Sequence, residues 1–207
     1  MASDKPVDNE RRQRVLDAAS LTFIRYGYRK TSMDEVAVAA DISRQGLYFY
    51  FSNKEDLFRE AMHKALSDGF SAAVARLENR AEPIDTRLVG AMDEWVGRHV
   101  GLRSADASYL IEKNTALLGN ILLEFSVAFE EKLATAIAES RLASTCAMLE
   151  LSPLDIARTL HACGLGWKRI LTSREVFVER IAVAVKLLCP AKAAKRRETA
   201  EAARRGD

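Results

Sequence analysis

Apolar side chains recur along this chain at intervals of three and four residues, the spacing that places them on one face of an α-helix. Pro83, Pro153 and Pro190 stand where these patterns begin or end, as expected for a residue that breaks a helix interior. The pattern therefore predicts an all-α protein of about nine helices. The predicted helices span residues 9–26, 33–40, 44–51, 85–100, 105–118, 120–141, 153–171 and 174–188, with a further long helix beginning at 52–55 and a polar connection at 142–152.

Two of these helices are short, adjacent and separated by only three residues. Ser32 precedes Glu35 by three positions, so its hydroxyl can accept the Glu35 amide while the carboxylate reaches back, forming a capping box. Asp41 tolerates the sharp turn that follows, and Ser43 can cap the next helix. The segment 32–51 therefore predicts a helix-turn-helix, whose second helix enters the major groove of DNA. Further caps are predicted at 52–55, Ser152 and Ser173.

The composition is that of a folded protein and restricts how it could bind DNA. Of 207 residues, 48% are hydrophobic and 29% charged, which is too apolar for a disordered chain. The net charge is only +2, so DNA binding would need a local basic patch. There is no apolar run long enough to span a membrane and no signal peptide at the N-terminus. The odd number of cysteines, Cys146, Cys163 and Cys189, fits a reducing cytoplasm, where we expect the protein.

The second short helix carries side chains suited to a DNA groove. Arg44 and Gln45 are long donors that match the edges of guanine and adenine, respectively. Gly46 is unfavourable in a helix interior but allows a close approach of the backbone. The candidate contacts to phosphate are hydroxyl groups, helix-start amides and one amine, contributed by Thr31, Ser32, Ser43, Tyr48, Tyr50 and Lys54.

These residues carry a family resemblance. The run TSMDEVAVAADISRQGLYFYFSNKEDL, preceded by VLDAASLTFIRYGYRK, resembles the DNA-binding domain of TetR-type transcriptional regulators. Thr22 stands where leucine is common and Asp41 where the turn usually has glycine, but neither change removes a DNA-facing group. The matching positions are Val15, Ala18, Ala19, Phe23, Gly27, Tyr28, Thr31, Val36, Ala37, Ala40, Ile42, Ser43, Leu47, Tyr48, Tyr50, Phe51, Lys54 and Leu57.

The resemblance implies roles for these residues and for the rest of the chain. Thr31, Ser43, Tyr48, Tyr50 and Lys54 would hold phosphates, while Arg44, Gln45 and Gly46 would face base edges. The C-terminal part would bind a small-molecule effector and form a homodimer through the last two helices. The implied organisation is a flexible tail at 1–8, a DNA-binding domain at 9–69, an effector-binding and dimerisation domain at 70–189, and a basic, disordered tail at 190–207.

The last two helices also favour a dimer on their own pattern. Val176, Val178, Val183 and Val185 make the final helix apolar on several faces, so it must be covered on more than one side. Four such helices, two from each subunit, would close a bundle. A core within one subunit would explain the same stripes and remains the alternative. The candidate dimer residues are Ile156, Leu160, Cys163, Gly164, Trp167, Leu171, Phe177, Ile181, Ala184 and Leu188.

The sequence defines the residues of the effector site less clearly than those of the DNA-binding surface. Large apolar residues with a few polar neighbours could line a pocket, although any helical core contains the same residue types. The three histidines, His63, His99 and His161, are scattered and are interpreted as core or surface residues, so no metal site is predicted. The candidate effector residues are Met92, Trp95, His99, Tyr109, Glu112, Asn114, Phe125, Phe129 and Trp167.

The leading prediction is a ligand-responsive repressor that binds a pseudo-palindromic operator as a dimer. Its predicted partners are double-stranded DNA, a second copy of the chain and a small molecule, with no cofactor and no membrane. An activator, a regulator without a small ligand, and a helical protein-binding adaptor are the alternatives. An enzyme is not expected, because residues 27–32 only superficially resemble a phosphate-binding loop and no catalytic motif is present.

Overall fold

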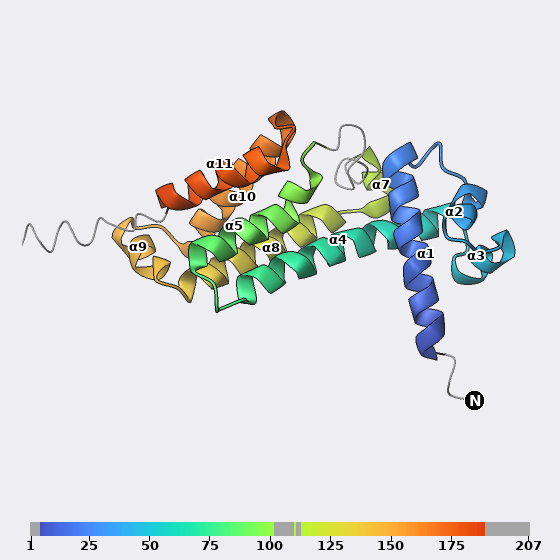
Figure 1. Cartoon of the computed structure of the whole chain (residues 1–207), viewed down its shortest axis with the longest axis horizontal. Coiled ribbons are helices and arrows are strands. Elements are labelled where there is room, and N and C mark those ends of the chain that lie inside the picture. The colour runs from blue at the N-terminus through green and yellow to red at the C-terminus, as the bar shows by residue number, and fades with distance from the viewer. Residues whose placement is uncertain (1–4, 102–109, 111–112, 189–207) are drawn as a thin grey trace, which may run out of the picture. The chain divides into compact units, whose positions relative to one another are not determined.

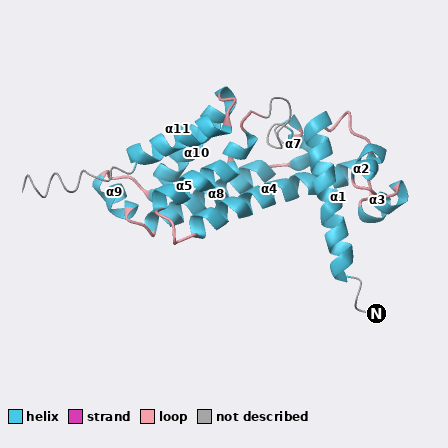
Figure 2. Cartoon of the chain, in the orientation of Figure 1, coloured by secondary structure: helices cyan, strands magenta, loops and turns pink. Residues whose placement is uncertain are grey.

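The computed structural model describes residues 5–101, 110 and 113–188 of the chain. Every regular element in this part is helical, which confirms the predicted all-α fold (Figures 1 and 2). The elements are α1 (Lys5–Tyr26), α2 (Met33–Ala39), α3 (Arg44–Tyr50), α4 (Lys54–Glu78), α5 (Ile84–Trp95), the 3₁₀ turn η1 (Gly97–His99), α7 (Thr115–Leu118), α8 (Ile121–Ala138), α9 (Leu142–Met148), α10 (Pro153–Ile170) and α11 (Arg174–Leu188).

The chain divides into two compact units, each made of two separate stretches. The first unit contains Met1–Ser71 and Leu102–Val127, and the second contains Ala72–Gly101 and Ala128–Asp207. Helices α4 and α8 each run from one unit into the other. The sequence placed one boundary after residue 69 and did not predict the return of 102–127 to the first unit.

Aromatic side chains form the core of the first unit. Phe23 of α1 packs edge-to-face on Phe58 of α4, with ring centroids 4.9 Å apart, and Tyr28 lies 4.7 Å from the Phe58 ring. Leu47 of α3 and Phe51 just after it are fully buried. Because these two residues are four positions apart, they fix one face of α3 against the core and leave the opposite face outside.

The second unit is built on the packing of α5, α10 and α11. Phe129 and Leu133 of α8 are fully buried with Leu160 of α10 and Phe177 of α11. A Cβ atom added at Gly97 would fall on the Phe177 ring and on the Asp93 carboxylate. Glycine at this position therefore allows η1 to lie close to α11.

Several boundaries differ from the sequence prediction. Helix α1 begins at Lys5, inside the predicted tail 1–8, because Pro6 is tolerated in a first turn and Asp8 is favourable there. Helix α5 ends at Trp95, where Gly97 favours the 3₁₀ turn over a continued α-helix. The segment 142–152, predicted as a polar connection, contains α9. The predicted tail 190–207 lies outside the described residues.

The predicted caps are confirmed with one shift. Ser32 and Glu35 form the complete capping box of α2, and Ser152 forms one with Asp155 at α10. The box predicted at 52–55 is displaced by one residue: Asp56 N donates to Asn53 Oδ1 at 2.9 Å. The Asp56 carboxylate accepts the Ser52 amide at 3.1 Å.

Candidate nucleic-acid interface

Helix α3 has one buried face and one open face. The Ser43 hydroxyl caps it by accepting the Gly46 amide at 3.0 Å, and Leu47 anchors it in the core. Arg44, Gln45 and Tyr48 are exposed, so the predicted base-reading and phosphate-binding side chains of α3 share an accessible surface. The turn before α3 places Asp41 at a φ of 53°, which explains why an aspartate can replace the usual glycine there.

Phe49 belongs to this surface, although the sequence did not single it out. Its side chain is 77% exposed, which is unusual for a large aromatic residue. Leu47 and Phe51 define the buried face by their four-residue spacing, and that spacing alone puts Phe49 on the outer side. The helical periodicity could therefore have identified it.

Arg44 is held in place by two neighbours. Its Nη1 donates to Asp34 Oδ2 of α2 at 3.1 Å, and its guanidinium lies 5.7 Å from the centroid of the Tyr48 ring. Both members of the ion pair are well exposed. Asp34 was not predicted, because pairing across the turn is not visible in the pattern of either helix.

Tyr50 makes a contact that reaches back to the first helix. Its hydroxyl donates to Asp8 Oδ1 at 2.7 Å, and this hydrogen bond, with a smaller effect of burial, raises the pKa of Tyr50. A phosphate at this position would therefore have to replace the Asp8 carboxylate.

Two of the predicted phosphate ligands, Thr31 and Lys54, donate hydrogen bonds to backbone carbonyls of the protein. Thr31 is 2% exposed and its hydroxyl donates to the Gly27 carbonyl at 2.9 Å, so this hydroxyl is engaged within the fold. Lys54 Nζ donates to the carbonyls of Tyr28 (3.2 Å) and Thr31 (3.1 Å) and lies 4.5 Å from the Tyr28 ring centroid. These bonds attach the loop between α1 and α2 to the start of α4. They also supply donors to two backbone carbonyls of that loop.

The serine hydroxyls remain exposed but act as caps. Ser32 Oγ accepts the Glu35 amide at 3.2 Å and donates to the Glu35 carboxylate at 2.9 Å. Bonds from the Ser32 backbone and side chain lower the pKa of Glu35. Arg29 and Lys30, in the loop just before Thr31, are exposed. They add positive charge to the approach to α2.

Comparison with known proteins identifies this arrangement. The family described as "Bacterial regulatory proteins, tetR family" matches residues 15–61, which cover α2, α3 and parts of α1 and α4. The HTH-type transcriptional regulator YhgD of Bacillus subtilis, itself uncharacterized, is 37% identical over 59 residues, 28% of this chain and 31% of YhgD.

Residues 15–61 of this chain therefore form a DNA-binding domain of the TetR family of bacterial regulatory proteins.

The match to curated relatives is confined to the N-terminal region, whereas the fold likeness covers most of the chain. The matched segment spans 24% to 34% of the length of the first curated relatives. Reduced NemR of Escherichia coli aligns with a TM-score of 0.66 at 15% identity, over 86% of this chain and 97% of NemR. AibR, solved with isovaleryl coenzyme A and operator DNA, aligns with a TM-score of 0.59 at 20% identity, over 87% and 98%. These likenesses show that most of the chain shares the fold of these two proteins.

The predicted effector residues fall in both units, and two of them lie outside the described residues. Met92, Trp95 and Phe129 pack in the core of the second unit, with the Trp95 and Phe129 rings 5.4 Å apart. Phe125 belongs to the first unit, where its ring lies 5.6 Å from His63 and 5.7 Å from Phe70. The other candidates are dispersed: His99 lies on η1, Asn114 donates to the Leu110 carbonyl at 2.7 Å, Trp167 is half-buried, and Tyr109 and Glu112 lie outside the described residues.

A buried polar network lies beside these aromatic rings and was missed by sequence. Trp95 Nε1 donates to His161 Nε2 at 3.2 Å, and His161 Nδ1 lies 2.9 Å from Glu130 Oε1. Because an indole only donates, Nε2 must accept and Nδ1 carries the hydrogen given to Glu130. Arg158 Nε lies 3.5 Å from the other Glu130 oxygen. The sequence treated His161 as an isolated core or surface residue, since its partners lie 66 and 31 positions away.

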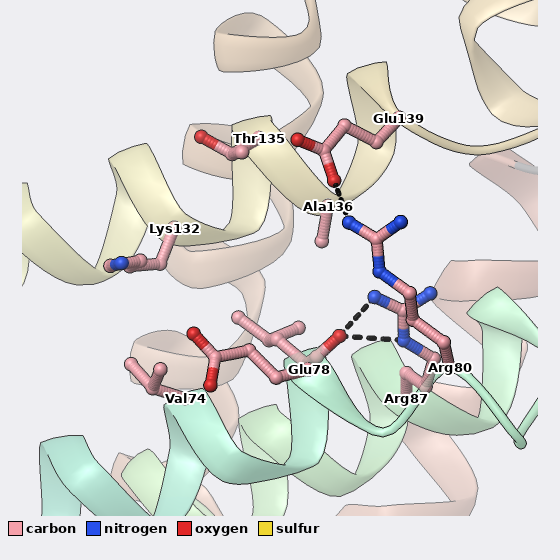
Figure 3. A pocket seen from close by; sticks show the side chains of 9 residues that line it. Val74, Glu78, Arg80, Arg87, Lys132, Thr135, Ala136 and Glu139 are labelled. Carbon is pink, nitrogen blue, oxygen red and sulfur yellow. Dashed lines mark hydrogen bonds and ion pairs between the residues drawn. The ribbon is translucent and has the colours of Figure 1, made fainter.

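A small surface pocket of about 180 Å³ lies in the second unit between α4, α5 and α8 (Figure 3). Its charged groups bond to the protein itself: Arg80 pairs with Glu139 at 2.6 Å, and Arg87 Nε donates to the Leu77 carbonyl at 2.7 Å. Arg87 thus satisfies a carbonyl at the end of α4. None of the predicted effector residues lines this pocket.

The predicted dimer residues are mostly core residues. A Cβ atom at Gly164 would collide with the Met92 side chain, with Ile181 and Phe177 next nearest, so this glycine allows close packing inside one protomer. Ile156, Leu160, Gly164, Phe177, Ile181 and Ala184 are buried within the protomer. Cys163, Trp167, Leu171 and Leu188 are half-buried. The apolar residues exposed on these helices are Leu165, Ile170, Val176, Val183 and Leu187.

Within the described ranges, no helix is long and apolar enough to cross a membrane. In the same residues, no three His, Cys, Asp or Glu side chains are grouped closely enough to hold a metal ion.

Proposed function

We propose that this chain is a sequence-specific DNA-binding transcriptional regulator that uses α3 as its recognition helix. The main support for this proposal is that α3 has two different faces. Leu47 anchors one face in the core, and the other face is exposed and presents Arg44, Gln45 and Tyr48. A helix of this kind, preceded by a short capped helix and a tight turn, is the element that helix-turn-helix proteins insert into the major groove. Family membership supports this proposal.

The test is selection of bound duplexes from a random DNA library, followed by titration of the best duplex against salt. A regulator enriches an inverted repeat and binds it with an affinity that falls steeply as salt rises, because phosphate contacts release counterions. Arg44→Ala is expected to weaken binding to this duplex about tenfold or more, as expected for loss of a bidentate base contact.

Arg141→Ala is the matched control, since Arg141 is also exposed and pairs with an exposed carboxylate, Asp85, in the second unit. It should leave binding unchanged. The proposal is wrong if the well-folded protein enriches no sequence, or if Arg44→Ala and Tyr48→Ala both bind like the wild type. Binding of a protein target through this surface, without steep salt dependence, would favour the adaptor alternative.

The proposed regulator acts as a homodimer through the outer faces of α10 and α11. Ile170 and Leu187 are 74% and 76% exposed in the protomer, and together with the exposed Leu165, Val176 and Val183 they give α10 and α11 a group of apolar side chains that a second protomer would cover. Two recognition helices held together would read two half-sites about 34 Å apart. Ile170→Asp is expected to shift the protein from dimer to monomer in analytical ultracentrifugation and to weaken operator binding. A monomeric wild type would contradict this part of the proposal.

The proposed regulator is a repressor released from DNA by a small molecule bound in the second unit. AibR, whose fold is similar, is known in complex with isovaleryl coenzyme A and operator DNA. A ligand releases DNA only if it binds the released conformation more tightly than the DNA-bound one. A reporter placed behind the selected operator distinguishes repressor from activator: deletion of the regulator raises expression in the first case and lowers it in the second.

A further inference from the structure

Arg44 is oriented by its surroundings in the described structure. Asp34 Oδ2 accepts Nη1 at 3.1 Å, and the Tyr48 ring lies beneath the guanidinium at 5.7 Å. Among the described residues, the Nε and Nη2 atoms of Arg44 have no hydrogen-bond partner. One corner of the guanidinium is thus held, and the edge with two parallel N–H groups remains open.

Fold stability does not account for Asp34 at this position. The side chains of Arg44 and Asp34 are 65% and 59% exposed, and ion pairs with such exposure contribute little to stability. A carboxylate beside a recognition helix is also repelled by DNA phosphates. Asp34 shares with Glu35 the favourable position of an acid in the first turn of α2, so the effect that is particular to Asp34 is its hydrogen bond to Arg44.

The open edge of Arg44 matches one base. The Nε and Nη2 donors are parallel and can bond simultaneously to O6 and N7 of guanine, the pairing that most often gives arginine its base specificity. A guanidinium free to rotate would spend part of its time bonded to phosphates, which carry no sequence information. The hydrogen bond from Arg44 Nη1 to Asp34 restricts this rotation before the protein binds DNA.

We infer that Asp34 is a positioning residue that directs Arg44 to guanine and thereby sets the base preference at one position of each half-site. The inference rests on the proposed function, because it concerns how α3 reads DNA. It assigns to α2 a part in sequence readout that requires no contact between Asp34 and the base.

The experiment compares wild type, Asp34→Asn and Asp34→Glu on four duplexes that differ at a single base pair. That base pair is the one at which the wild type prefers guanine and Arg44→Ala does not. Asp34→Asn is expected to lower the preference for guanine about fivefold, a part of the discrimination that a full bidentate contact provides. Asp34→Glu keeps the carboxylate and is expected to restore part of the preference.

Asp85→Asn is the matched control. Asp85 is the second residue of α5 as Asp34 is of α2, and each pairs with an exposed arginine. The control removes the same charge in the second unit, so it should leave the guanine preference unchanged. Circular dichroism and urea denaturation of each variant verify that its overall fold and stability are retained.

The possible results separate this inference from the proposed function. If Asp34→Asn binds all four duplexes more tightly by the same factor, Asp34 only repels DNA and the inference is wrong while the regulator stands. If the wild type shows no guanine preference that depends on Arg44, the inference is also wrong. If the wild type enriches no DNA sequence, the proposed function and the inference fail together.

Discussion

The helix-turn-helix surface and the interior of the second unit each bring together a carboxylate, a nitrogen group and an aromatic ring. On the surface these are Asp34, Arg44 and Tyr48, all exposed. In the interior they are Glu130, His161 and Trp95, of which the histidine side chain is 2% exposed. The exposed set keeps N–H groups open to a ligand. The buried set satisfies its own donors and acceptors, and no buried side-chain N or O atom in the described part lacks a partner. Burial thus decides whether similar groups serve recognition or packing.

The largest effect is expected from His161→Ala, which tests the buried set. The change removes packing and leaves Trp95 Nε1 and the Glu130 carboxylate without their partner, so the free energy of unfolding should fall by about 3 kcal/mol. Urea denaturation measures this loss. His63→Ala, at an exposed histidine, should change stability by about 0.5 kcal/mol or less. A loss at His161 no greater than at His63 would remove the contrast between the two sets.

A smaller effect is expected from Thr31→Val, which tests whether the buried Thr31 hydroxyl of the first unit stabilises the fold. Loss of its bond to the Gly27 carbonyl should lower the free energy of unfolding by about 1 kcal/mol. The salt dependence of DNA binding should stay the same. Thr135→Val is the control, since Thr135 makes the same type of bond to Glu131 but is exposed. If the affinity of Thr31→Val for DNA depends less steeply on salt than that of the wild type, Thr31 does contact phosphate.

Asp34→Asn should have almost no effect on stability, because it removes only an exposed ion pair. The expected change is at most about 0.5 kcal/mol in urea denaturation. The same isosteric change in the buried set, Glu130→Gln, should lower stability more, since it removes the charge that accepts from His161. Equal losses from the two variants would show that burial does not separate the two sets.

The smallest effect concerns the capping box of α2 and depends on pH. The pKa of Glu35 is lowered in the folded state by its bonds to Ser32, so its stabilising contribution is complete above the unfolded pKa and is lost as pH falls through the folded pKa. Stability of the wild type should therefore fall more steeply than that of Glu35→Gln between about pH 5 and pH 3. Chemical denaturation across this range measures the difference. Parallel curves would show that the cap does not hold Glu35 ionised.

Local patterns predicted the first unit well. The Ser32–Glu35 box, the turn at Asp41 and the burial of Leu47 all depend on residues a few positions apart, and all three are found in the structure. The family also followed from this segment. Thr31 was assigned to DNA because a hydroxyl next to a helix start suits a phosphate, and its local pattern does not show that it is buried.

Contacts between distant segments explain what the sequence could not predict. Nothing near His161 in the chain indicates that Trp95 and Glu130 surround it. The stripe on α10 was correctly recognised as buried, but a stripe does not state whether its partner is another helix of the same protomer or a second copy. At Gly164 the neighbouring side chain is Met92 of the same protomer, 72 positions away in the chain.

The discontinuous make-up of the first unit has a consequence for synthesis. Met1–Ser71 leaves the ribosome well before Leu102–Val127, although both belong to this unit, and the Phe125 ring lies against Phe70. Ala72–Gly101 is synthesised between these two stretches and belongs to the second unit, whose other stretch begins only at Ala128. Domains of most chains mature one after another from the N-terminus. A nascent chain that ends at Gly101 therefore contains only part of the residues of each unit.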